Sequence, residues 1–213
     1  MNIGIIGATG WIGSALMQEA QRRQLPVTAL VRDPAKITGE LVGRVTTRVI
    51  DLEQGIDPQV FEGIDLVIAA VGGRASGQHQ LVPQSAKALL ELLPNTQVKR
   101  LLWVGGAGSL ELAHGHTLVQ SPGFPPEYKD EALAQGEALE VFRVSDSAVN
   151  WTFVSPAAEI YPGASEGPYR IGGDKFFTDE EGRSRISVAD YAKAMLDLVD
   201  TDDYARQRIS VAY

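Results

Sequence analysis

Gly7, Gly10 and Gly13 lie three residues apart near the start of the chain, in the segment GIIGATGWIG (4–13). Gly7 lets the chain leave a strand sharply, and Gly13 lets a helix pack close to that strand. Between them, Gly10 lets the backbone approach a bulky anion, which the free N–H groups of the following helix attract. A strand-turn-helix unit of this kind predicts a site for the pyrophosphate of NAD(H) or NADP(H). A tight turn with no ligand is the alternative.

The end of the second predicted strand bears on the choice of cofactor. NAD-binding folds place an acidic residue there, about 20 residues after the glycines, where it binds the ribose 2′-hydroxyl. This chain has Arg32 and Lys36 instead, with Asp33 beside Arg32. Two cations suit a 2′-phosphate, so the sequence favours NADP(H) over NAD(H). A solvated charge pair at the strand end is the alternative.

Composition bounds the class of protein. The chain has 213 residues, 44% of them hydrophobic, and a net charge of −8, which argues against nucleic-acid partners and anionic membranes. It has no cysteine, and its two neighbouring histidines in AHGH (113–116) lack an acidic partner set, so we expect no metal site. No apolar run reaches the ~20 residues of a membrane helix, and the N-terminus lacks a basic signal region. We expect a cytoplasmic monomer or homodimer whose mature chain begins at or near Met1.

Strand-like and helix-like segments alternate along the chain. Strands are expected over 2–7, 26–32, 44–51, 65–72, 99–106, 150–156 and 207–213, and helices over 11–24, 78–93, 125–146 and 187–200, the last with Ser187 as its N-cap. The strands are mostly apolar runs without alternation, which is typical of a parallel sheet covered on both faces. We therefore predict an α/β, Rossmann-like doubly wound sheet with helices on both faces. Loops rich in glycine and proline, at 105–126 and 156–174, follow two strands at the carboxyl edge, where such sheets bind ligands.

Five segments carry a resemblance to a known family: GATGWIG, LVRDPAK, VGGR, WVGGAGSL and SRISVADYAKAM. They resemble the atypical short-chain dehydrogenase/reductases, NmrA-like proteins with an NAD(P)H-binding domain. Within that group the chain is most similar to the NADH–flavin reductases, which are similar in turn to biliverdin IXβ/flavin reductase. The resemblance covers nearly the whole chain. We expect one NAD(P)-binding Rossmann domain over 1–213, in which residues from about 156 to 186 form a small C-terminal substrate lobe.

The resemblance also implies a role for individual residues. Those expected near the cofactor are Gly7, Thr9, Gly10, Trp11 and Ile12 at pyrophosphate and ribose, Arg32 and Lys36 at the adenosine phosphate, Asp51 and Leu52 at adenine, Val71, Gly72 and Arg74 at the central ribose and a phosphate, and Ser155, Pro156, Ala157 and Ala158 at the nicotinamide. Asp51 reads equally well as an ordinary turn residue. Trp11 either covers the cofactor or substrate or packs against a loop.

The chain departs from the family at the residues that reduce carbonyls. Ordinary members carry Tyr-x-x-x-Lys, in which the lysine assists the tyrosine as general acid. Tyr128 opens the corresponding helix, but the fourth residue after it is Ala132, and no tyrosine in the chain has a lysine four positions on. Hydride transfer to a flavin, such as FMN or FAD as substrate, does not strictly need that acid, because the flavin delocalises the incoming charge.

Other side chains leave two interpretations open. Ser109 and Tyr128 are the candidate catalytic residues, although Ser109 could equally satisfy loop backbone. Phe176 and Phe177 either form a wall of a flat substrate site or anchor the small lobe. His79 is expected to be a solvated residue at a helix start, and Trp103, within a strand, is expected in the core.

Three functions compete on this evidence. The first is an NAD(P)H-dependent oxidoreductase that reduces a small molecule, namely a flavin, a quinone-like compound or another conjugated acceptor. The second is a non-catalytic NADP(H)-binding redox sensor, which the missing Tyr-Lys pair allows. The third is a nucleotide-sugar epimerase or dehydratase, disfavoured by the same absence and by the short C-terminal lobe.

Overall fold

The computed structural model describes residues 1–39 and 43–213, and of His114 it describes the backbone alone. The strands of its main sheet are β1 (Ile3–Ile6), β2 (Val27–Val31), β3 (Thr46–Val49), β4 (Leu66–Ala69), β5 (Arg100–Val104), β6 (Asn150–Pro156), β8 (Arg170–Gly172) and β10 (Gln207–Ala212). Their order in this 8-stranded sheet is β3-β2-β1-β4-β5-β6-β10-β8. All neighbours pair in parallel except β10 and β8. The order from β3 to β6 is that of doubly wound dinucleotide folds, so the predicted fold class is confirmed.

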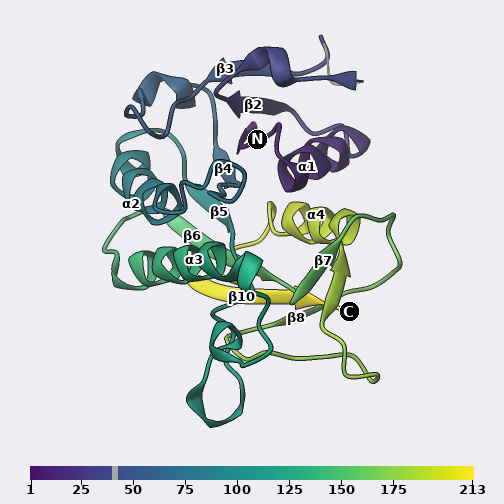
Figure 1. The fold of residues 1–213 in the computed structure, drawn as a ribbon. Coiled ribbons are helices and arrows are strands. Elements are labelled where there is room, and N and C mark those ends of the chain that lie inside the picture. The colour runs from purple at the N-terminus through teal and green to yellow at the C-terminus, as the bar shows by residue number, and fades with distance from the viewer. Residues whose placement is uncertain (40–42) are drawn as a thin grey trace.

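Helices cover both faces of the sheet (Figure 1). They are α1 (Trp11–Arg22), α2 (Leu81–Leu92), α3 (Pro126–Val144) and α4 (Val188–Asp197). α1 and α4 pack together on one face, and α2 and α3 on the other. The N-cap predicted at Ser187 is confirmed, because its Oγ accepts a hydrogen bond from the backbone N–H of Asp190.

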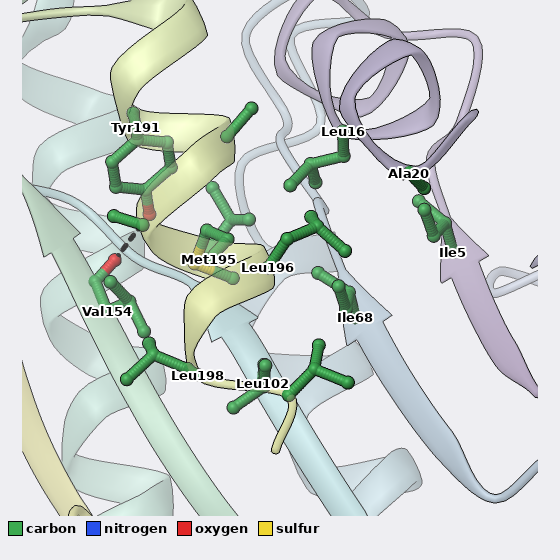
Figure 2. Packing of buried hydrophobic residues seen from close by; sticks show 14 of the residues in the cluster. Ile5, Leu16, Ala20, Ile68, Leu102, Val154, Tyr191, Met195, Leu196 and Leu198 are labelled. Atoms are coloured by element: carbon green, nitrogen blue, oxygen red, sulfur yellow. Dashed lines mark hydrogen bonds between the residues drawn. The ribbon is translucent and has the colours of Figure 1, made fainter. Parts of the chain in front are cut away.

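The core divides into two layers, one on each face of the sheet. On the α1/α4 face, Leu16 and Met195 lie over the strands, and Tyr191 donates from its hydroxyl to the carbonyl oxygen of Val154 at 2.7 Å (Figure 2). On the other face, Phe142 of α3 packs edge-on to Trp103, with ring centroids 5.4 Å apart. The predicted core position of Trp103 is therefore confirmed.

Two crossovers depart from a regular βαβ alternation. Between β2 and β3 the described residues hold a short 3₁₀ turn, η1 (Pro34–Lys36), and no α-helix, as the sequence predicts. The crossover from β6 to β10 is long. It contains β8, which joins the main sheet, and a separate parallel pair of β7 (Glu159–Tyr161) and β9 (Arg185–Ser187).

A buried carboxylate fastens this long crossover to α4. Asp190 accepts hydrogen bonds from the hydroxyls of Ser165 and Tyr213, both at 2.5 Å, and from the backbone N–H of Glu166 at 2.8 Å. Burial alone would raise the pKa of Asp190, but these hydrogen bonds outweigh it and hold that pKa below its ordinary value. The ionised carboxylate therefore joins a loop, a helix and the last residue of the chain.

We expect Asp190→Asn to lower the free energy of unfolding by about 2 kcal/mol at neutral pH, because the buried donors lose a charged acceptor. A lowered pKa in the folded state contributes stability that is fully present above the unfolded aspartate pKa, about 3.9, and is lost as the pH falls through the folded pKa. Urea unfolding at pH 7 and pH 3 measures the difference from wild type, which should shrink at pH 3. The exposed Asp200→Asn is the control, and a difference that stays constant between the two pH values would contradict the assignment.

Candidate functional site

The glycines in the turn between β1 and α1 are not equivalent: the backbone requires two of them, and the third is free of close contacts that would require glycine. Gly7 has φ +75°, and a Cβ on it would overlap the carbonyl oxygen of Ala70, while a Cβ on Gly13 would overlap the carbonyl oxygen of Gly7. Gly10 is different: a Cβ there would meet only the Gly7 oxygen, at 3.2 Å. The fold therefore needs glycine at 7 and 13, whereas the exposed Gly10 leaves room at the N-terminus of α1 for a ligand.

A cavity of about 1080 Å³ runs along the carboxyl ends of the parallel strands and includes this turn. The predicted site residues that line it are Gly7, Thr9, Gly10, Trp11, Ile12, Arg32, Lys36, Leu52, Val71, Gly72, Arg74, Tyr128, Pro156, Ala157 and Ala158. They come from the ends of separate strands and from the start of α3. The volume and the bare backbone at Gly10 fit a dinucleotide.

Three predicted residues do not line this cavity. Asp51 accepts hydrogen bonds from the backbone N–H groups of Glu53, at 2.9 Å, and Gln54, so it caps a turn. Ser155 is buried in β6 with its hydroxyl facing Arg208, at 3.5 Å. Ser109 has a buried hydroxyl with no hydrogen-bond partner among the described residues. The contacts of these three side chains are thus with the protein outside the cavity lining.

The cationic end of the cavity contains an acidic residue that the sequence analysis missed. Arg32, whose side chain is 61% exposed, forms an ion pair with Glu53, 2.9 Å from nitrogen to oxygen. The other oxygen of Glu53 accepts from the Gln78 amide at 3.4 Å. Lys36 lines the same end without an ion pair among the described residues. The sequence did contain one indication of this role: Glu53 is an acidic residue shortly after the third strand, next to the residues expected at adenine.

One face of α3 forms the opposite wall. Tyr128, Glu131, Ala132 and Gln135 line the cavity at helical spacing, so they share a face. Both ends of the Gln135 amide are engaged: it accepts from the Trp103 indole and donates to the carbonyl oxygen of Val71, both at 3.0 Å. It therefore fixes α3 against the ends of β4 and β5.

A histidine–carboxylate pair lies on this wall, and it corrects the expectation for His79. His79 is not simply a solvated residue at a helix start, because its Nδ1 lies 2.9 Å from Oε2 of Glu131 and its side chain is 24% exposed. The same Glu131 oxygen accepts from the backbone N–H of Gly73 at 3.0 Å. The pair went unpredicted because its members are 52 positions apart. The sequence indicated only that Glu131, three residues after Tyr128 in a helix, lies on the same face as Tyr128.

Aromatic side chains border the mouth of the cavity. Trp11 is 48% exposed at the start of α1, and the Arg74 guanidinium stacks on the Tyr128 ring at 4.6 Å. Phe176 and Phe177 are not among the lining residues. Phe177 packs instead beside Gly172, where a Cβ would lie 2.6 Å from its ring. Its contacts therefore fit the anchoring interpretation.

A buried arginine holds the loop after β5 in place. Arg208 of β10 donates to a carboxylate oxygen of Asp174 at 2.6 Å and to the carbonyl oxygen of Ser109 at 3.3 Å. Burial lowers the pKa of Arg208, and the hydrogen bond to Asp174 opposes that shift. The backbone of Ser109 thus anchors the loop after β5 to β10.

The described residues give no sign of a metal site or a membrane helix. Among them, no group of three or more His, Cys, Asp or Glu side chains is placed to hold a metal ion. No helix in that part of the chain is both long and apolar enough to span a membrane.

Comparison with known proteins identifies the family. The family model described as NAD(P)H-binding matches residues 7–202. Uncharacterized protein YwnB of Bacillus subtilis (strain 168) is 39% identical over 215 residues, which cover 99% of this chain and 98% of YwnB. The crystal structure of a "putative NADH-flavin reductase" from Streptococcus pneumoniae TIGR4 is similar at 36% identity and a TM-score of 0.88, covering 100% of this chain and 99% of that one. A "putative epimerase" from Bacteroides thetaiotaomicron is similar at 34% identity and a TM-score of 0.87, covering 100% and 96%.

The family match contains the glycine turn, the cavity walls and α4, so it accounts for the site as well as the sheet. The resemblance inferred from the sequence motifs is confirmed at this level. The chain belongs to the NAD(P)H-binding family of Rossmann-like proteins.

Proposed function

We propose that the protein is a cytoplasmic NADPH-dependent reductase that transfers hydride to a flavin or another conjugated small-molecule acceptor. One observation supports this most: a single cavity includes the cationic end at Arg32 and Lys36, the open turn at Gly10, and a partly apolar chamber between α3 and the end of β6. Such a cavity accommodates a dinucleotide with a flat acceptor beside its nicotinamide end.

The walls would act mainly by positioning. The glycine turn and the start of α1 would hold the pyrophosphate, and Arg32 and Lys36 the adenosine phosphate. The bound cofactor would supply the hydride. Apolar lining from Phe124, Pro125, Ile160 and Pro162 would hold the acceptor ring and exclude water from it.

Turnover distinguishes this proposal from its alternatives. Purified protein is mixed with NADPH and FMN, riboflavin or a quinone, and cofactor oxidation is followed by absorbance. A redox sensor would bind NADPH and oxidise it with none of these acceptors. The absence of a Tyr-x-x-x-Lys pair counts against the epimerase alternative, whose chemistry in this superfamily relies on that acid.

The open position in the turn gives the first functional prediction. Gly10→Val should weaken NADPH binding by at least about tenfold, or 1.4 kcal/mol, because the branched side chain occupies the pyrophosphate position. Circular dichroism should show a native fold, since little surrounds Gly10. Gly173→Val, with open space around it and outside the cavity, is the control. Unchanged affinity in Gly10→Val would mean that this glycine serves the turn alone.

The Arg32–Glu53 pair predicts the cofactor preference. We expect wild type to bind NADPH more tightly than NADH, and Arg32→Gln to lose about 1.5–3 kcal/mol of NADPH binding, because it lacks the charged hydrogen bond to phosphate. Glu53→Gln should strengthen NADPH binding, since it frees Arg32 from its ion pair. Dissociation constants for both cofactors on the three proteins provide the test. Equal affinities of wild type for NADPH and NADH would refute the preference.

The last functional prediction concerns the candidate catalytic residues. Tyr128→Phe and Ser109→Ala should each lower kcat/KM for FMN reduction by less than about tenfold, or 1.4 kcal/mol of barrier, because a flavin needs no strong acid and Ser109 lies outside the cavity. Trp11→Ala should cost more, through lost orientation at the mouth. Steady-state kinetics measure all three. A thousandfold loss in Tyr128→Phe would instead reveal a general acid.

A further inference from the structure

Glu131, which lines the cavity, and its partner His79, which does not, form a polar pair that flavin reduction leaves unused. The Glu131 side chain is 20% exposed, and its Oε2 accepts from both the His79 ring and the Gly73 backbone. Its Oε1 lies 3.2 Å from the point that a Cβ on Gly72 would occupy, and both residues line the cavity. Oε2 is therefore held by two donors, and Oε1, which the Gly73 N–H approaches at 3.3 Å, borders the cavity beside Gly72.

Among the polar residues at or near the α3 wall, the Glu131–His79 pair is the best candidate for a proton donor. Gln135 uses both ends of its amide on Trp103 and Val71. Ser109 lies outside the cavity, and Tyr128 has no lysine to assist it. Glu131 itself is one position before Ala132, which stands where the family lysine would be.

The charged and titratable groups around the pair come from two elements. The segment before α2 contributes Arg74, stacked on Tyr128 of α3, and His79 itself. Farther along α3, Glu137 accepts from the Gln80 amide at 3.4 Å. Among the described residues, His79 is the one basic side chain within ion-pair distance of Glu131. His79, whose side chain is 24% exposed, therefore connects Glu131 to water.

We propose that Glu131 and His79 together serve as a general acid, which extends the reductase to acceptors whose charge develops on a single oxygen, namely quinones and enones. This inference rests on the proposed function. The acceptor receives hydride from the cofactor, and the electron pair appears on its carbonyl oxygen. The His79 imidazolium passes its Nδ1 proton to the Glu131 carboxylate, and the Glu131 carboxyl then gives that proton to the acceptor oxygen to form O–H. The neutral imidazole takes a proton from water, so each turnover consumes one hydride and one proton.

The test compares two acceptors in the same protein. NADPH-dependent kcat/KM is measured for FMN, which delocalises charge, and for menadione, a quinone, in wild type, Glu131→Gln and His79→Gln. Glu137→Gln is the matched control, a carboxylate on the same helix that lies outside the cavity. Dissociation constants for NADPH and thermal melting curves are recorded for each, so that loss of binding or folding is seen separately.

We expect Glu131→Gln to lower kcat/KM for menadione at least about tenfold more than for FMN, given the 10²–10⁴-fold that general acids typically contribute. NADPH affinity should change little, and the control should match wild type. Formate should partly restore the menadione rate of Glu131→Ala, because a small acid can enter the vacated space.

Equal losses for the two acceptors would assign Glu131 a positioning role and overturn the inference while leaving the reductase intact. Loss of NADPH binding in Glu131→Gln, with the control unaffected, would assign it to cofactor binding and overturn the inference in the same way. A wild type that oxidises NADPH with neither acceptor would overturn the proposed function together with the inference. If Glu131→Gln does not fold, His79→Gln supports the same comparison.

Discussion

The site depends on two close contacts between backbones, both of which involve Gly7. Gly7, at positive φ, lies against the carbonyl oxygen of Ala70, and Gly13 lies against the carbonyl oxygen of Gly7. No side chain fits at either position, so the end of β1, the end of β4 and the start of α1 are held together without intervening atoms. The free end of α1 therefore points along the carboxyl edge of the sheet, where the cavity opens. Gly10 lies between the two constrained glycines but is not constrained itself, which leaves its position free to serve a ligand.

The second wall depends on α3 approaching the strands just as closely. A Cβ on Gly108 would lie 2.7 Å from the Cβ of Ala132, and one on Gly106 would lie 3.1 Å from that of Gln135. These glycines let α3 settle against the loop after β5, and the Gln135 amide then joins β4 to β5. Ala132 is accordingly a packing residue. The polar groups of this wall come from its neighbours on the same face of α3, namely Tyr128, Glu131 and Gln135.

The sequence predicts the parts of the molecule that local signals encode. The glycine turn, the apolar parallel strands and the Ser187 cap each depend on residues close together in the chain, and all three are found. The pairs His79–Glu131 and Arg208–Asp174 join residues 52 and 34 positions apart. These pairs form only once the helices and strands have packed together, and the hydrophobic periodicity of the sequence does not predict that packing. Asp51 shows the converse: its place after a strand suggested adenine, yet its oxygen caps the local turn.

The glycines that shape the site and the side chains that face its cavity lie on different elements, so the chemistry of the site can change while the fold is kept. Substituting the constrained glycines disturbs the sheet, but residues 128, 131, 132 and 135 project from a helix that Gln135 already holds in place. A different acid or base on that face changes what the cavity can protonate while β1, β4 and α1 stay as they are. In this chain the lysine position carries Ala132, and the adjacent Glu131 is oriented by a histidine and a backbone N–H from the segment after β4. The acid–base pair of this site therefore comes from two elements on the same face of the sheet, namely α3 and the segment between β4 and α2. In the usual Tyr-x-x-x-Lys arrangement, both residues come from one helix.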